Sequence, residues 1–108
     1  MTMVETDTQA EEISCASILK ALADDTRLLV VKHLLAGEAH VGEMQEELGV
    51  EQSLLSHHLK HLRKAGIVES QRDGKAVLYR LTPALEDRRR GRTLDFGCCQ
   101  ISFRSDCC

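Results

Sequence analysis

The chain has 108 residues, a formal net charge of −3, five cysteines and no tryptophan. This length suits one small domain with a modest core, for which oligomerisation is a natural supplement. No apolar run approaches the roughly 18 residues of a membrane span, and the acidic start is neither a signal nor a transit peptide. We therefore expect a cytoplasmic protein without a membrane partner, whose reduced cysteines serve metal, metalloid or redox chemistry rather than structural disulfides.

The charge is distributed unevenly along the chain. Residues 1–51 carry a net charge of −8, residues 52–80 a net +4, and residues 81–108 a net +1. A basic segment inside an acidic chain indicates a localised anionic partner, and such asymmetry is more informative than the total.

Apolar residues at helical spacing predict three helices in the first half of the chain. After a flexible N-terminus of residues 1–8, the helices are expected at about 9–23, 24–36 and 40–48. Cys15, Ile18, Leu19 and Leu22 form the apolar stripe of the first helix, and we interpret Cys15 as a small buried side chain in preference to a ligand. His40 opens the third helix, where a cap or a solvent contact is an ordinary role.

A fourth helix and a hairpin follow a short glycine turn. The helix runs from Gln52 to Ala65 and ends at Gly66, with Leu55, Leu59 and Leu62 on one apolar face and polar or basic residues on the others. Residues 67–72 and 76–81 are rich in β-forming side chains and flank Asp-Gly-Lys, which predicts a tight hairpin.

This order of elements indicates a winged helix-turn-helix, of mainly α class with a small β-hairpin (α+β). Short polar side chains at the start of the fourth helix suit base edges, and basic ones at its end suit phosphates. The hairpin tip is placed to reach a minor groove or the backbone of a DNA duplex. The predicted DNA contacts are Gln52, Ser53, Ser56, His57, Lys60 and Arg63 on the helix, and Arg72 and Lys75 on the hairpin.

The end of the chain is predicted to be a short helix and a tail. Thr82 and Pro83 start the helix, Arg88, Arg89 and Arg90 fill its last turn, and Gly91 ends it. The tail, residues 92–108, has no clear periodicity and holds four cysteines.

Five segments resemble the ArsR/SmtB family, bacterial and archaeal winged-helix repressors that sense metals and metalloids. They are residues 22–28 (LADDTRL), 38–50 (EAHVGEMQEELGV), 52–66 (QSLLSHHLKHLRKAG), 73–75 (DGK) and 79–81 (YRL). The resemblance implies a homodimer packed through its first and last helices, an operator with inverted symmetry, and release of the DNA when an inducer binds. Residues 9–91 would then be the DNA-binding and dimerisation domain.

The resemblance is incomplete at the sensing sites. His40 and Gly42 stand where many family members place a cysteine pair, and the final helix has no histidine for the zinc-sensing version. We therefore expect residues 92–108 to be the sensor. The predicted ligands are Cys98 and Cys99, with a third from Cys107 or Cys108. Thiolates are soft ligands, and the resemblance to arsenic-resistance regulators favours As(III) or Sb(III) as inducer.

Several alternatives stay open. The four tail cysteines suit a tetrahedral zinc site, and Cd, Pb, Cu(I), thiol oxidation or persulfidation would act on the same sulfurs. Another alternative is that the tail is disordered and its cysteines form no site. A thiol enzyme or metal-sequestering protein is a more remote reading, because no general base lies near the tail cysteines in sequence. A module for protein contacts would not need six basic residues in the helix and hairpin. We expect no enzyme and no small organic substrate.

Overall fold

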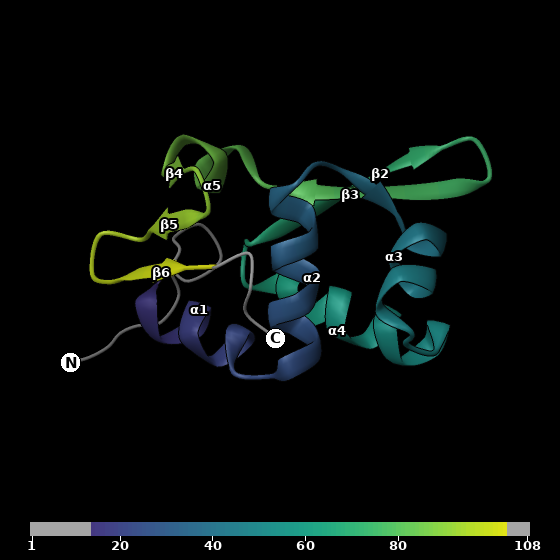
Figure 1. Ribbon diagram of the computed structural model, residues 1–108, viewed down its shortest axis with the longest axis horizontal. Helices are drawn as coiled ribbons and strands as arrows, with labels where there is room; N and C mark the ends of the chain where they lie inside the picture. The colour runs from purple at the N-terminus through teal and green to yellow at the C-terminus, as the bar shows by residue number, and fades with distance from the viewer. Residues whose placement is uncertain (1–13, 104–108) are drawn as a thin grey trace.

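The computed structural model describes residues 14–103 (Figure 1). It has a winged helix-turn-helix at its centre and a second small sheet at its C-terminal end. The helices are α1 Cys15–Leu22, α2 Asp25–Leu35, α3 Val41–Leu48, α4 Gln52–Lys64 and α5 Pro83–Asp87. The strands are β1 Ala39–His40, β2 Val68–Asp73, β3 Ala76–Leu81, β4 Arg89–Arg90, β5 Thr93–Asp95 and β6 Gln100–Ser102. None of the helices so described is long and apolar enough to cross a membrane.

Local capping sets where the first two helices begin. Ser14 is extended and its hydroxyl accepts a hydrogen bond from the Ser17 N–H at 3.1 Å, so α1 starts at Cys15. The expected start near residue 9 is therefore wrong, and residues 9–13 lie outside the described part of the chain. The Asp24 carboxylate caps α2 by accepting from the N–H groups of Thr26 and Arg27, at 2.8 and 3.1 Å.

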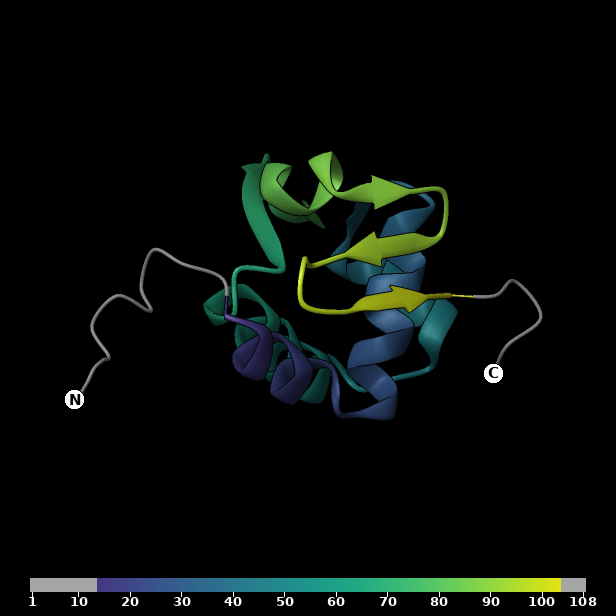
Figure 2. The same ribbon diagram turned by 90° about the vertical axis from the view of Figure 1, so that its left-hand side faces the viewer.

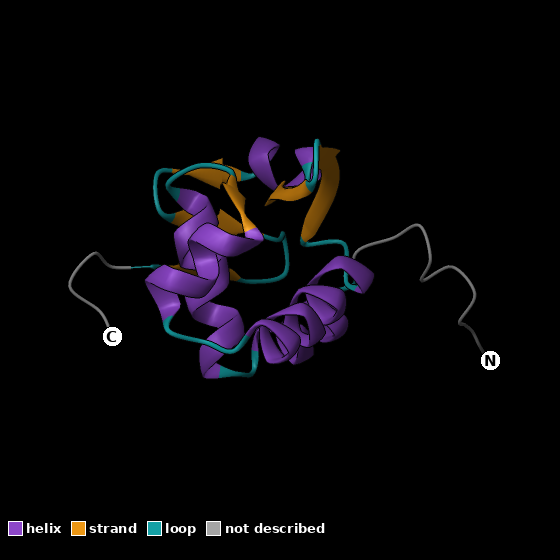
Figure 3. Ribbon diagram, turned by 90° about the vertical axis from the view of Figure 1, so that its right-hand side faces the viewer, coloured by secondary structure: helices purple, strands orange, loops and turns teal. Residues whose placement is uncertain are grey.

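The helix-turn-helix and the wing follow the predicted order. Gly49 ends α3 with φ +65°, a left-handed conformation that favours glycine. After α4, strands β2 and β3 pair antiparallel from Val68↔Leu81 to Asp73↔Ala76. Short strand β1 joins the other edge of β3, giving the strand order β1-β3-β2. Viewed from the wing end, most helices occupy the lower part of the molecule and most strands the upper part (Figure 3).

The C-terminal part differs from the prediction. Helix α5 ends at Asp87, so the expected helix up to Gly91 is wrong, and Arg89 and Arg90 form β4. The Arg89 guanidinium donates to the Leu35 carbonyl at the end of α2, which holds this segment against the domain instead of continuing the helix. Strand β4 pairs with β5, and β5 with β6, forming a sheet over the segment expected to be an irregular tail (Figure 2).

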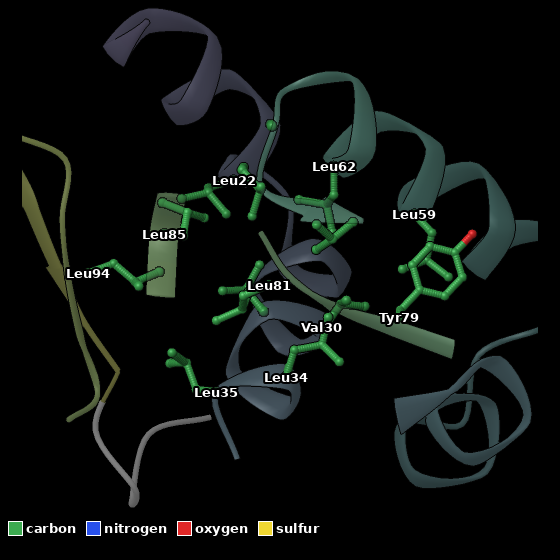
Figure 4. Close-up of a cluster of buried hydrophobic side chains, with 14 of the residues drawn as sticks. Leu22, Val30, Leu34, Leu35, Leu59, Leu62, Tyr79, Leu81, Leu85 and Leu94 are labelled. Atoms are coloured by element: carbon green, nitrogen blue, oxygen red, sulfur yellow. The ribbon is translucent and has the colours of Figure 1, made fainter. Parts of the chain in front are cut away.

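One core joins both halves of the molecule. Leu22 of α1, Leu62 of α4, Leu81 of β3, Leu85 of α5 and Leu94 of β5 converge in it (Figure 4). The predicted inward leucines of α4 (Leu55, Leu59 and Leu62) are fully buried, which confirms that assignment. In α1 the prediction is partly wrong, because Leu19 is 47 % exposed and Ala21 is buried instead. The C-terminal segment adds three buried side chains to the same core: Leu94 in β5, and Phe96 and Phe103, which directly follow β5 and β6.

Candidate functional site

The polar face of α4 is open to solvent. Its apolar face packs inward, which leaves the short polar side chains of its first turns and the basic ones of its last turns outside. All six residues predicted to contact DNA from this helix are exposed: Gln52, Ser53, Ser56, His57, Lys60 and Arg63. The helix can therefore present donors, acceptors and positive charge on one surface.

His58 belongs to the inner side of α4 and anchors this helix to α2. It is buried, and its Nε2 atom lies 3.9 Å from Oδ1 of Asp24, the residue that caps α2. Burial acts to raise the pKa of Asp24, but the hydrogen bonds from Arg27 and Thr26 and the nearby His58 outweigh it and lower that pKa. Asp24 is thus ionised at neutral pH, and it faces the buried histidine of α4.

The C-terminal half of α4 carries a cationic hollow, lined by His57, Lys60, His61 and Lys64. The rings of His57 and His61 meet edge to face, with centroids 4.7 Å apart. Desolvation lowers the pKa of His61, and the charge of Arg27 acts in the same direction. The lowered pKa favours the neutral form of the His61 imidazole, which can then donate and accept hydrogen bonds.

The wing presents two of its three basic residues to solvent. Arg72 and Lys75 are exposed on either side of the turn at Gly74, whose φ is +66°. Arg80 is engaged within the protein: its guanidinium donates to Glu69 at 2.9 Å, to Gln71 at 2.8 Å and to Glu38 at 3.3 Å. The pairs with Glu69 and Glu38 raise the pKa of Arg80. These two carboxylates balance the charge of Arg80 within the protein.

A second group of candidate functional side chains lies at the opposite end of the molecule. The Sγ atoms of Cys15, Cys98 and Cys99 all lie within 4.8 Å of one another. Cys15 is the first residue of α1, and the other two occupy the loop between β5 and β6. Cys98 is bonded to Cys15 in a disulfide, with Cα atoms 6.4 Å apart, and its sulfur lies 4.0 Å from that of Cys99, which is free.

Two of the four predicted sulfur ligands thus meet, together with a cysteine outside the predicted set. Cys107 and Cys108 lie outside the described residues. The sequence favours a buried apolar role for Cys15, and this residue does pack against the core, but its sulfur faces the pair. The sequence feature that points to a ligand role for Cys15 is its position at the start of a helix, because the helix dipole favours a thiolate there.

Comparison with known proteins identifies the family. A profile described as "Bacterial regulatory protein, arsR family" matches residues 24–70. The "Biofilm growth-associated repressor" of Xylella fastidiosa is 42 % identical over 84 residues, which cover 78 % of this chain and 72 % of that protein. The chain belongs to the ArsR family.

Solved structures of transcriptional regulators have the same fold. The crystal structure of the transcriptional repressor BigR from Xylella fastidiosa matches with a TM-score of 0.60 and 45 % identity, over 64 % of this chain and 70 % of that one. A homodimeric winged helix-turn-helix DNA-binding domain from Mycobacterium bovis, described as a possible ArsR-family regulator, matches with a TM-score of 0.61 and 32 % identity, over 64 % of each chain.

Membership of the ArsR family accounts for the α4 face and the wing. The related proteins are described as repressors, and this chain is a transcriptional regulator of the ArsR family. The thiol group is different, because Cys15, Cys98 and Cys99 all lie outside the matched residues 24–70. The family match therefore assigns no role to these three cysteines.

Proposed function

We propose that this ArsR-family protein represses transcription as a homodimer bound to an inverted-repeat operator, and that it leaves the DNA when As(III) or Sb(III) binds Cys15, Cys98 and Cys99. The observation that carries the proposal is the meeting of three sulfurs within 4.8 Å. This revises the ligand set expected from the sequence, in which Cys107 or Cys108 supplies the third sulfur. Cys98 and Cys99 are common to both sets.

Three thiols match the chemistry of trivalent arsenic. Each thiol replaces one hydroxyl of arsenous acid and releases one water, so three sulfurs complete the coordination, with the arsenic lone pair on the fourth side. Adjacent cysteines suit such a site only where the backbone turns, and Cys98 and Cys99 occupy a loop next to Gly97, whose φ is +91°. Zinc prefers four ligands, and only three meet among residues 14–103. The site requires the reduced form, in which the Cys15–Cys98 disulfide is open.

The proposed DNA surface consists of the exposed face of α4 and the wing. Gln52, Ser53, Ser56 and His57 would meet base edges, while Lys60 and Arg63 would meet phosphates together with Arg72 and Lys75 of the wing. Two such surfaces in a homodimer would read the two halves of a symmetric site. The dimer is supported by the homodimeric relative from Mycobacterium bovis and by Leu19, which α1 leaves 47 % exposed.

A packed path connects the thiols with the DNA surface. Cys15 opens α1, and α1 packs against both α2 and α4. An arsenic atom that binds Cys15 together with Cys98 and Cys99 would tie α1 to the C-terminal sheet and shift α1 against α4. Such a contiguous path can couple two sites if the two arrangements differ in DNA affinity.

The central experiment measures operator release. A duplex selected from a randomised library by the wild-type protein is labelled, and its anisotropy is followed while arsenite, antimonite, Cd, Zn, Pb or Cu(I) is added under reducing conditions. We expect arsenite and antimonite to release the wild-type protein. The Cys98→Ser/Cys99→Ser variant should bind the duplex like the wild type and resist release.

Two further results separate the parts of the proposal. Replacement of Arg72 and Lys75 by alanine should lower the slope of log affinity against log salt by about one for each phosphate that the wing no longer neutralises. An unchanged slope would remove the wing from the DNA surface. Release by arsenite that survives the double serine replacement would refute the thiol site while leaving DNA binding intact.

Redox sensing is a second candidate, favoured by the disulfide between Cys15 and Cys98. Their Cα separation of 6.4 Å lies within the usual range for a disulfide. In this version the oxidised and reduced proteins differ in operator affinity without any metalloid. The same anisotropy assay tests redox sensing when the protein is treated with hydrogen peroxide and then with dithiothreitol. Mass spectrometry of the oxidised protein identifies the bonded cysteines.

A further inference from the structure

His40 lies where three elements of the DNA-binding unit meet. It ends β1, directly precedes α3, and stands opposite Leu78 of β3. Its Nε2 atom is 2.8 Å from Oδ2 of Asp73, the last residue of β2, and its Nδ1 atom is 3.3 Å from Oε1 of Glu43. The backbone N–H of His40 also donates to Glu43 Oε1, at 2.7 Å.

The two carboxylates define the state of the imidazole. An ionised carboxylate only accepts hydrogen bonds, and a neutral imidazole has a single N–H to donate. The ring satisfies both partners when it is protonated. In agreement with this, the hydrogen bond with Asp73 raises the pKa of His40, and the hydrogen bond with Glu43 acts in the same direction.

The position of the His40–Asp73 pair along the wing gives it a consequence for DNA binding. Strand β1 supports β3 only at Tyr79 and Leu78, whereas the β2–β3 hairpin continues outward to Asp73↔Ala76. A two-stranded ribbon has little stability of its own in water. The hydrogen bond between His40 and Asp73 reaches beyond the β1 pairing to the start of the turn, two residues before Lys75.

We propose that His40 is a positioning residue for the wing, whose protonated imidazole ties the end of β2 to the start of α3 and thereby fixes Lys75 relative to α4. This inference rests on the proposed DNA-binding function. His40 itself need not touch DNA; it acts through the hairpin, so its effect depends on Asp73 and on Lys75.

The pH dependence has a defined sign. The charged groups that face His40 are Asp73 of β2 and Glu43 of α3, and His33 of α2 acts in turn on Glu43. Because the pKa of His40 is raised, its ion pair is fully formed below the ordinary histidine pKa of about 6.5. The ion pair disappears as the pH rises through the raised pKa. Wing order should therefore decrease towards alkaline pH.

The test compares operator affinity of wild type and His40→Asn from pH 6 to 9 at fixed salt, with the duplex selected by the wild type. Asparagine is a good helix cap, so this variant keeps the start of α3 while it removes the ion pair with Asp73. We expect binding to be about two- to fivefold weaker at pH 6.5, the scale of an exposed ion pair. The gap should close as the pH rises. Both proteins share every other titratable group, so the ratio of their affinities is the diagnostic quantity.

Three further variants test whether His40 acts through Asp73 and Lys75. Asp73→Asn should weaken binding to the same extent, and the double variant should bind no more weakly than either single variant. In a Lys75→Ala background, His40→Asn should have no further effect. His40→Arg keeps a cation at every pH, so it should retain binding with a flatter pH profile. A ratio that is constant from pH 6 to 9, or additive effects of the two single replacements, would overturn the proposal.

A measurement without DNA separates this proposal from the proposed function. Backbone NMR order parameters at Gly74 and Lys75 should fall in His40→Asn at pH 6.5 and converge with the wild type at pH 9. Equal order at pH 6.5 would refute the positioning role. If the wild type selects no duplex at all, the proposed function fails, and these order parameters alone decide whether His40 holds the wing.

Discussion

At the scale of single residues, the sulfur of Cys15 sets how many thiolates the candidate arsenic site has. Cys98 and Cys99 come from one loop, and Cys15 is the thiol that brings α1 into the site. Without it the loop pair alone remains among the described residues. Arsenic would then bind without joining two elements, and binding would no longer be coupled to α1.

We predict that Cys15→Ser weakens arsenite binding at least about tenfold, because loss of an outer-shell partner alone costs 10–100-fold at metal sites. X-ray absorption should report three sulfur ligands in the wild type and fewer in the variant, and the variant should no longer release the operator. The matched control is Cys107→Ser/Cys108→Ser, which removes the thiols expected from sequence to supply the third ligand. Normal release by Cys15→Ser, together with failure of release in the control, would reverse the assignment.

Sequence patterns are sufficient to predict which side chains of α4 and of the hairpin tip are exposed. The eight predicted DNA contacts are all exposed, because helical spacing separates Leu55, Leu59 and Leu62 of α4 from its polar side chains and the Asp-Gly turn sets the hairpin register. Arg80 has the same charge as Arg72, and the pattern does not distinguish them. The Arg80 guanidinium donates to Glu69 across the strand pair and to Glu38, which precedes β1. These partners are distant in sequence, and only the fold brings them next to Arg80.

At the scale of elements, the C-terminal sheet holds the cysteine loop in place. The sequence after Gly91 has no strong alternation, and β4, β5 and β6 are only two or three residues long, so the sheet could not be predicted from periodicity. The sheet is stabilised by its packing against the core through Leu94, which is fully buried. The meeting of Cys15 with Cys98, 83 residues apart in sequence, depends on that packing and was equally unpredictable.

We predict that Leu94→Ala destabilises the protein by about 2–5 kcal/mol, as expected for a buried leucine replaced by alanine. Urea unfolding measures this change in the free energy of unfolding. Because the sheet positions the cysteine loop, arsenite affinity should fall as well, while operator binding under conditions where the variant stays folded should change little. Ile101→Ala is a matched control, since Ile101 is on the neighbouring strand and only partly buried. Equal effects of both variants on arsenite affinity would argue against a specific role for Leu94.

At the scale of the whole molecule, the two proposed functional regions lie at opposite ends, with the wing on one side and the C-terminal sheet on the other (Figure 1). Any effect of arsenic on DNA therefore has to pass through the core that α1 and α4 share. An inducer shifts such an equilibrium only by the difference between its affinities for the free and the DNA-bound protein.

This condition gives a reciprocal prediction. If arsenite lowers operator affinity by a factor within the roughly 5–150-fold range typical of allosteric coupling, the operator must lower arsenite affinity by the same factor. Arsenite titrations with and without saturating duplex, followed by the ultraviolet absorbance of the arsenic–thiolate bonds, measure the second factor, and anisotropy measures the first. Cys98→Ser/Cys99→Ser should show neither effect. Release of DNA without any change in arsenite affinity would mean that arsenite acts through aggregation or thiol chemistry elsewhere, and the coupled-site mechanism would be wrong.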